Sequence, residues 1–278
     1  MKKREIRKTI RGQRAVDGAG VHLVRVLGNR DVKDFDPFLM LDSFDSEDPA
    51  DYTAGFPMHP HRGIETITYL ISGEIEHEDS LGNKDIIHAG ESQWMTAGSG
   101  ILHQEMPKPS ERMLGFQLWL NLPQKEKMVE PAYLSMTKEM MPEIVKDNAK
   151  IRVLSGTFED ANGVVPRHIP ASIVDIQLQR GKTIEIPTKS DETVFVFFIE
   201  GDAQINEQMI PSKTAVLFEE GDCISVSAKE DSDTRFIFFS AKALHEPIAW
   251  GGPIVMNTEE ELENAFEELR RGEFIKHK

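Results

Sequence analysis

Cysteine is almost absent from this chain, which has one cysteine among 278 residues. Secreted domains of this size are commonly stabilised by paired cysteines, so we expect no disulfide framework. We expect instead an intracellular protein, cytoplasmic, or nuclear if its source is eukaryotic. Cys223 lies in the apolar segment CISVSA, which predicts that it is a small residue of the core.

Long apolar runs are also lacking. The longest, residues 194–199 (VFVFFI), is far shorter than the ~20 residues that a membrane-spanning helix needs, so we expect no transmembrane segment. The basic N-terminal sequence MKKREIRKTIRGQR is not followed by the apolar stretch of roughly 7–15 residues that a secretory signal requires. Its alternation of Ile6 and Ile10 with charged residues predicts an arm leading into the first strand.

Basic residues are outnumbered, since 32 Lys and Arg against 47 Asp and Glu give a formal net charge of −15. Nucleic-acid binding needs clustered Lys and Arg to neutralise phosphates. We therefore expect no direct nucleic-acid binding through the body of the protein. The basic N-terminus is the one exception, and a charge run of this length is usually solvated surface.

Short β-rich segments separated by turn residues occupy most of the chain. Turn clusters such as residues 79–83 (DSLGN) and 161–163 (ANG) lie between them, a pattern typical of all-β sandwiches and barrels. The predicted strands are HLVRVL, ETITYLI, QWMTA, GFQLWLNL, SIVDIQL, TVFVFFI, TAVLF, CISVSA and RFIFFSA.

Residues 258–271 carry the strongest helical pattern. Their apolar residues follow the i, i+3, i+4, i+7 spacing of a helix face at Leu262, Ala265, Phe266 and Leu269. Thr258 and Glu261 form a capping box, and Gly272 supplies a C-terminal stop. We expect this helix to pack back on a barrel. A weaker helical pattern spans residues 137–148.

An internal repeat predicts two similar barrels. The segments LISGEIE (70–76) and IIHAGES (86–92) have counterparts in FIEGDAQ (198–204) and VLFEEGDC (216–223). In each half, the two segments together are typical of a strand, a turn formed by glycine and an acidic residue, a second strand and a second such turn. We predict an N-terminal barrel over residues 1–130 and a C-terminal barrel plus helix over 131–278, joined through roughly residues 125–150.

Two pairs of metal-binding side chains lie at strand spacing. His59 and His61 are at i and i+2, and in an extended strand such residues point to the same face. Pro60 between them has no N–H to donate, so this stretch is predicted to be an edge strand or a strand entry. His103 and Glu105 repeat the spacing. Together the pairs can surround one ion with three nitrogens and one oxygen.

The repeat offers a test of this site. Positions in the two halves can be matched by counting from the repeat glycines. The positions in the second half that match His59, His61, Glu65, His103 and Glu105 are then Pro187, Lys189, Thr193, Thr234 and Phe236. None of the five is a residue type that typically binds metal. A pattern required for folding would tend to occur in both halves. Its confinement to one half favours a functional site.

These residues also carry a family resemblance. Residues 55–65 (GFPMHPHRGIE) resemble the first cupin motif, and residues 90–103 resemble the second. The strings HPHRGIETITYL, QWMTAGSGILHQEMP, GGPIVMNTEEELENAF and RGQRAVDGAGVHLVRVLG closely resemble the pirin family. The resemblance implies an all-β fold of two tandem cupin (double-stranded β-helix, or jelly-roll) barrels, with a mononuclear iron-type site in the N-terminal barrel and a metal-free C-terminal barrel.

The resemblance places the family's metal ligands on His59, His61, His103 and Glu105. Typical cupins use the glutamate of the first motif instead, which is Glu65 here. Glu65 is four residues beyond His61, about 13 Å along a straight strand, and reaches the ion only if the chain bends at Gly63. We favour Glu105, with Glu65 as a supporting or substitute ligand.

Such a ligand set leaves about two of six octahedral positions open and favours Fe(II), with Mn, Co, Ni or Zn as substitutes. Family members are described as quercetin 2,3-dioxygenases, redox-responsive regulators of transcription or modulators of metabolic enzymes. We expect a dioxygenase that acts on a small aromatic, flavonol-like substrate and dioxygen, with Glu105 as the catalytic base. The alternatives are a redox- or metal-responsive module read by a protein partner and, less favoured, a cupin isomerase or zinc hydrolase.

The remaining histidines and nearby aromatic residues are expected to have structural roles. His77 and His88 are predicted to lie at the surface or in hydrogen bonds. Several large side chains flank the motifs and are more typical of a core, although as a group they are compatible with an aromatic substrate. They are Phe56, Met58, Trp94, Met106, Phe116 and Trp119.

Overall fold

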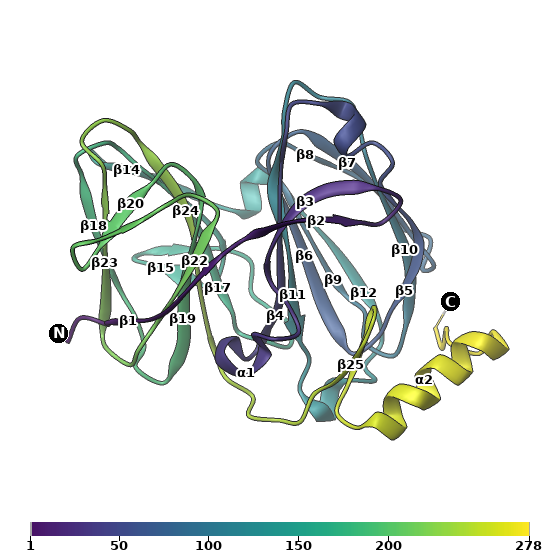
Figure 1. Cartoon of the computed structure of the whole chain (residues 1–278). Helices are drawn as coiled ribbons and strands as arrows, with labels where there is room; N and C mark the ends of the chain where they lie inside the picture. Colours follow the sequence, from purple (N-terminus) through teal and green to yellow (C-terminus); the bar gives the residue numbers. More distant parts are fainter. Residues whose placement is uncertain (1, 278) are drawn as a thin grey trace. The chain divides into compact units, whose positions relative to one another are not determined.

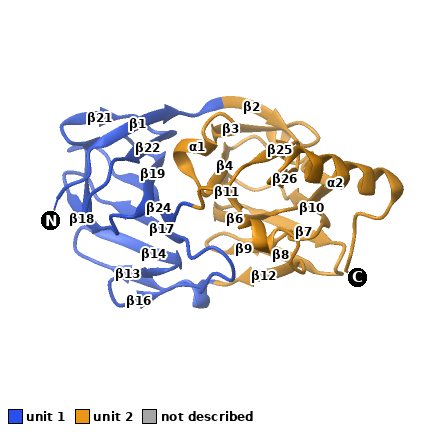
Figure 2. Cartoon of the chain, turned by 90° about the horizontal axis from the view of Figure 1, so that it is seen from below, with its two compact units in different colours: residues 1–13, 138–243 blue, residues 14–137, 244–278 orange. Residues whose placement is uncertain are grey.

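A computed structural model describes residues 2–277, which form two compact units (Figure 1). Unit 1 consists of residues 1–13 and 138–243, and unit 2 of residues 14–137 and 244–278 (Figure 2). This division differs from the predicted one at both ends of the chain. The first strand belongs with the second half of the sequence, and the C-terminal helix with the first half.

Unit 2 contains two antiparallel sheets, a hairpin and both α-helices. The larger sheet has the order β12 (Ala132–Met136), β9 (Ser92–Thr96), β6 (Ile64–Ser72), β11 (Met113–Asn121), β4 (Phe38–Ser46), β3 (Val21–Leu27) and β2 (Gln13–Asp17). The smaller sheet has the order β5 (Phe56–His61), β10 (Ile101–Pro107), β7 (Glu74–Asp79) and β8 (Lys84–His88). The hairpin pairs β25 (Ala249–Gly251) with β26 (Ile254–Met256), and the helices are α1 (Val32–Phe35) and α2 (Glu259–Arg271).

Unit 1 repeats this plan. Its larger sheet has the order β1 (Ile6–Arg11), β22 (Thr214–Phe218), β19 (Glu192–Glu200), β24 (Thr234–Lys242), β17 (Ser172–Leu178), β14 (Ala149–Ser155) and β13 (Glu143–Val145). Its smaller sheet has the order β18 (Thr183–Pro187), β23 (Cys223–Ala228), β20 (Ala203–Ile205) and β21 (Gln208–Ile210), and a short hairpin joins β15 (Thr157–Phe158) to β16 (Ala161–Asn162). Cys223 is buried, as predicted.

The shared strand order confirms the two-barrel prediction and corrects one detail of the repeat. Gly73 and Gly201 occupy matching positions, between β6 and β7 and between β19 and β20. Gly221, however, precedes β23, the counterpart of β10, whereas Gly90 precedes β9. The position that matches His103 therefore lies in β23 and not in β24. Matching Gly221 to Gly90 by their distance from the first repeat glycine was misleading. The hairpin of β20 and β21 has only three residues in each strand, fewer than β7 and β8, so equal distances along the chain do not reach equivalent positions.

Each predicted strand overlaps a strand of the structure, and the C-terminal helix is confirmed. The Thr258 side chain accepts from the Glu261 amide, and the capping box is complete. Gly272 ends the helix in the left-handed conformation, at φ +72°. The weaker helical prediction, residues 137–148, is wrong, because Pro142 interrupts the segment and only a single 3-10 turn, Lys138–Met140, forms before β13.

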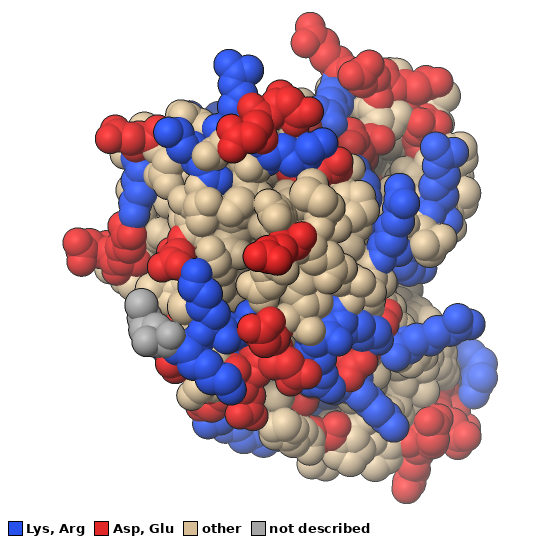
Figure 3. Space-filling model, turned by 60° about the vertical axis from the view of Figure 1, so that its left-hand side comes forward, with Lys and Arg blue, Asp and Glu red and all other residues tan. Residues whose placement is uncertain are grey.

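The surface carries charges of both signs. On the face shown in Figure 3, lysine and arginine side chains are interspersed with aspartate and glutamate. Within the described residues 2–277, no helix is both long and apolar enough to span a membrane.

Candidate metal centre

Strands β5 and β10 bring the predicted histidines together in unit 2. The strands pair antiparallel, with His103 opposite His59 and Ile101 opposite His61. β5 is the edge strand of its sheet, as the proline between the two histidines predicted. Burial alternates along β10, so His103 and Glu105 both point to the interior of the unit.

The three imidazole rings converge on one another. Ring centroids lie 4.4 Å apart for His59 and His103, 4.8 Å for His59 and His61, and 5.0 Å for His61 and His103. One nitrogen from each ring lies within 4.8 Å of the others. Among the described residues these three histidines form the one cluster of His, Cys, Asp and Glu side chains with the spacing of a metal site.

Hydrogen bonds fix the tautomers of the two β5 histidines. His59 Nδ1 donates to the carbonyl oxygen of Pro57 over 2.8 Å, and His61 Nδ1 donates to that of Pro253 over 3.0 Å. In the neutral rings both Nε2 atoms are then unprotonated. These atoms face each other at 3.1 Å, so two lone pairs point into the same space. Such an arrangement favours binding of a cation between the nitrogens.

Electrostatics keep His61 and His103 in the neutral form that binds metals. Burial, reinforced by the neighbouring His59, lowers the pKa of His61 from 6.5 to about 3. Burial and the adjacent histidines also lower the pKa of His103 well below its usual value. Both rings are therefore neutral at physiological pH, and neither ring nitrogen of the buried His103 has a hydrogen-bond partner among the described residues.

This donor set fits a transition-metal ion. Two nitrogens each about 2.1 Å from one ion and about 90° apart would be separated by about 3 Å, close to the observed 3.1 Å between the Nε2 atoms of His59 and His61. Neutral imidazoles without thiolates suit iron, copper, nickel and zinc. The residues present can therefore hold a mononuclear metal through three nitrogens.

The two candidate carboxylates lie outside the cluster of mutually close ligand atoms. Glu105 is buried, and its oxygens accept hydrogen bonds from Thr68 at 2.9 Å, Gln93 at 2.5 Å and Gln117 at 2.6 Å. Glu65 is fully buried in β6 and accepts from Thr96 at 2.8 Å. Glu105 follows His103 on the same strand face, so it remains our candidate for the fourth ligand.

A distant part of the chain supports the site. The carbonyl that orients His61 belongs to Pro253, in the turn between β25 and β26. Gly63, with φ +77°, lets the chain turn between β5 and β6, and a Cβ there would lie 2.0 Å from the carbonyl oxygen of Val255. Buried Arg62 donates to the carbonyl of Phe274 at 2.9 Å and pairs with Glu268 of α2 at 2.8 Å. The C-terminal segment therefore buttresses the segment that carries His59 and His61.

His77 is more closely associated with the site than the sequence indicated. It is buried, its Nε2 donates to the carboxylate of Asp79 over 3.1 Å, and its ring centroid lies 5.5 Å from that of His103. In the strand register His77 is opposite Glu105. The alternation along β7 could have shown that it faces inward. His88 is exposed and contacts Glu74, as predicted for a surface residue.

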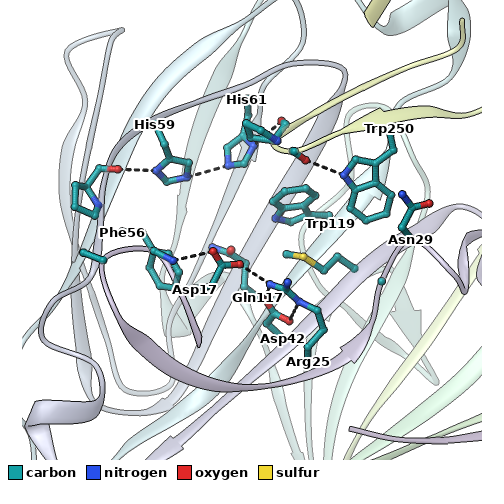
Figure 4. A pocket seen from close by; sticks show the side chains of 17 residues that line it. Asp17, Arg25, Asn29, Asp42, Phe56, His59, His61, Gln117, Trp119 and Trp250 are labelled. Atoms are coloured by element: carbon teal, nitrogen blue, oxygen red, sulfur yellow. Dashed lines mark hydrogen bonds and ion pairs between the residues drawn. The ribbon is translucent and has the colours of Figure 1, made fainter. Parts of the chain in front are cut away.

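A pocket of about 660 Å³ opens onto His59 and His61 (Figure 4). Its apolar lining includes Met40, Phe56, Trp119 and Trp250. Its polar lining includes Asp17, Arg25, Asp42 and Gln117. Of the aromatic and methionine residues considered from the sequence, Phe56 and Trp119 line this pocket, whereas Trp94 and Phe116 are core residues and Met58 is half exposed. The polar residues and Trp250 were missed because they lie outside the two segments that carry the histidines, residues 55–65 and 90–105.

Comparisons with known proteins agree with this geometry. Residues 20–120 match the family model described as Pirin, and residues 173–275 match the Pirin C-terminal cupin domain. A pirin-like protein of Caulobacter vibrioides is 38% identical over 98% of this chain and 99% of its own length. A Pseudomonas aeruginosa protein named "putative quercetin 2,3-dioxygenase" is 40% identical over 97% of each chain. The crystal structure of quercetin 2,3-dioxygenase from Acinetobacter baumannii, 31% identical, matches with a TM-score of 0.89 over 98% of each chain. The chain belongs to the pirin family, and its two units are cupin domains.

Proposed function

We propose that this protein is a mononuclear metal-dependent dioxygenase of the quercetin 2,3-dioxygenase type. The observation that carries the proposal is the pair of unprotonated Nε2 atoms of His59 and His61, which face each other at 3.1 Å beside a pocket lined by aromatic residues. The volume of the pocket, about 660 Å³, is within the range of binding sites for molecules the size of a flavonol. The names of the similar proteins from Pseudomonas aeruginosa and Acinetobacter baumannii support the same reaction class.

In this proposal His59, His61, His103 and Glu105 are the ligands, and Fe(II) is the resident ion, with Mn, Co, Ni or Zn as substitutes. Bound Fe(II) would supply Lewis acidity and electron transfer to dioxygen. The Nδ1 hydrogen bonds of His59 and His61 hold their Nε2 atoms in the ligand orientation, as outer hydrogen bonds do in metal sites generally.

Glu105 is the proposed base that accepts the proton of a substrate hydroxyl. Gln117 both lines the pocket and donates to Glu105 at 2.6 Å, so it connects the pocket with the buried carboxylate. Thr68 and Gln93 donate to the other oxygen and restrain its rotation. Deprotonation raises the electron density of the flavonol ring and makes it reactive toward dioxygen. The apolar walls exclude water from the ring.

The test uses protein purified without oxygen and analysed for its metal content. After reconstitution with Fe(II), quercetin is added in air, and the loss of flavonol absorbance is followed together with oxygen consumption. We expect equal consumption of the two substrates and no loss of absorbance under nitrogen. Manganese, cobalt, nickel and zinc forms compared in parallel identify the metal that supports turnover. Fully metal-loaded protein that leaves quercetin unchanged in air would contradict the proposal.

A further inference from the structure

A cluster of three charged side chains lies in the pocket wall, away from the two histidines (Figure 4). Arg25 of β3 donates to both oxygens of Asp42 of β4, at 2.9 and 2.7 Å. It also donates to Asp17, the last residue of β2, at 2.6 Å. Arg25 and Asp42 are paired across neighbouring strands, so the sheet itself holds the cluster in place.

This cluster has no spare positive charge. One guanidinium is shared between two carboxylates, in the two-pronged geometry typical of an arginine–carboxylate pair. Burial raises the pKa of Asp42, and the hydrogen bonds from Arg25 oppose that shift. Even with Asp42 protonated the cluster would be neutral, and with both carboxylates ionised it carries one negative charge. An anionic group of a ligand is therefore not attracted to this end of the pocket.

Asp17 is the carboxylate of the cluster that is open to a ligand. Its side chain is 48% exposed, whereas that of Asp42 is 4% exposed and fully engaged by Arg25. One oxygen of Asp17 accepts from the Gly18 amide at 2.8 Å and the other from Arg25. Partial burial opposes ionisation, but these hydrogen bonds prevail and lower the pKa of Asp17. Each carboxylate oxygen can accept a second hydrogen bond, so Asp17 can still accept one from a ligand hydroxyl.

The space between the cluster and the histidines is lined by flat apolar surfaces. Trp119 and Trp250 have ring centroids 5.8 Å apart, and Met40 also belongs to the lining. Phe56 lies on the other side of the pocket (Figure 4). In Figure 4 Trp119 lies between His61 and the Arg25–Asp42 pair, so a flat ligand that extends from the histidines toward the cluster can pack against its ring. Planar aromatic molecules suit such walls because they bury large apolar area at little cost in conformational entropy.

We propose that Asp17, positioned by Arg25 and Asp42, is the specificity-determining residue of this pocket and selects flat aromatic ligands that present a neutral hydroxyl donor at this end. This inference rests on the proposed function for the other end of the ligand, whose acidic oxygen faces His59 and His61. Aromatic ligands with a carboxylate at the Asp17 end are disfavoured, because the carboxylate would lose its hydration without gaining a cation.

The test measures binding without turnover. Zinc-loaded protein under nitrogen is titrated by calorimetry with three ligands that share the flavonol oxygens. Quercetin carries hydroxyls on its outer ring, 3-hydroxyflavone carries none there, and 4′-carboxy-3-hydroxyflavone carries a carboxylate. We expect the native protein to bind quercetin most tightly. A hydrogen bond to a charged group predicts that Asp17→Asn weakens quercetin binding about tenfold. The variant should bind the carboxylated ligand more tightly and 3-hydroxyflavone as before.

Asp45→Asn is the matched control. Asp45 lies in β4 like Asp42 and pairs with Arg112 at 2.7 Å, but it does not line the pocket. The Asp45→Asn variant should therefore bind all three ligands with the affinities of the native protein. The inference is overturned if Asp17→Asn changes all three affinities by the same factor or none of them, or if native protein does not prefer quercetin. Because no oxygen is present, a protein that shows the expected affinities yet fails to consume quercetin in air would contradict only the dioxygenase proposal.

Discussion

The smaller sheets of the two units have the same strand order but different interiors. In unit 2, the β5–β10 pair places His59 opposite His103 and His61 opposite Ile101. In unit 1, the β18–β23 pair places Ile184 opposite Val226 and Ile186 opposite Ile224, and all four residues are buried in the apolar core. The same backbone arrangement thus surrounds a polar cluster in one unit and close-packed aliphatic side chains in the other.

The contrast shows that the cupin framework does not depend on its histidines. Unit 1 is held together by apolar burial, the dominant favourable contribution to folding. Unit 2 instead buries His61, His77, His103 and Glu105, which costs free energy wherever a polar atom lacks a partner. Such a cost is typical of a functional site, and the larger sheet of unit 2 supplies the compensating apolar contacts. Four predictions test this comparison.

The largest effect is expected from removing one of the proposed metal ligands. His103→Ala takes away one of three converging nitrogens, and we expect metal affinity to fall by at least ~100-fold, since even outer-shell changes cost 10–100-fold. Metal content after dialysis and calorimetric titration measure the change. His88→Ala, an exposed histidine of the same unit, is the control and should bind metal normally. Retention of full metal content by His103→Ala would show that the cluster is structural.

The second prediction separates binding from catalysis. Glu105→Gln preserves the size of the side chain but removes its negative charge, so we expect weakened but measurable metal binding. Flavonol turnover should fall by ~100-fold or more, the usual contribution of a general base. Glu65→Gln is the matched comparison, and it should retain more metal binding and more flavonol turnover than Glu105→Gln. Unchanged turnover in Glu105→Gln would remove this residue from the mechanism, and a larger loss in Glu65→Gln would assign the role to Glu65.

The third prediction exchanges the interiors. Val226→His places an unpartnered imidazole in the apolar core of unit 1 and should lower the free energy of unfolding by about 2–4 kcal/mol. His103→Val in metal-free protein should cost less than about 1 kcal/mol, because neither nitrogen of His103 has a partner to lose among residues 2–277. Urea unfolding of both variants without metal measures the difference. Similar losses in the two variants would show that the interiors tolerate polar groups equally.

The last prediction concerns the pH dependence of stability. The folded-state pKa of His61 is about 3, below the value of 6.5 expected when unfolded, and that of His103 is also lowered. Between these values the unfolded state binds more protons, so metal-free protein should lose stability as pH falls below about 6.5, by up to about 1.4 kcal/mol per pH unit for each group. Urea unfolding at pH 7.0, 6.0 and 5.0 measures the slope. His61→Gln should make it shallower, and an unaltered slope would assign the pH dependence to other groups.

Much of the site was predictable because it depends on local geometry. Side chains two residues apart share a strand face, so His59 and His61, and likewise His103 and Glu105, could be paired from their spacing. The capped C-terminal helix was predictable for the same reason, since Thr258 and Glu261 are within one turn. The alignment of the two repeats was harder to predict from the sequence. Because hairpin lengths differ between the units, Gly221 was wrongly matched to Gly90.

The alternating pattern of short strands, the two-barrel repeat and the histidine pairs were determined by the sequence itself, because covalent geometry places residues at i and i+2 on one face wherever a strand forms. Only the tertiary structure decided that Pro253, some 190 residues from His61, supplies the carbonyl that sets its tautomer. The same holds for the assembly of Asp17, Arg25 and Asp42 in the pocket wall. These contacts join strands that are paired by packing and sheet hydrogen bonds, and spacing along the chain does not encode such pairings.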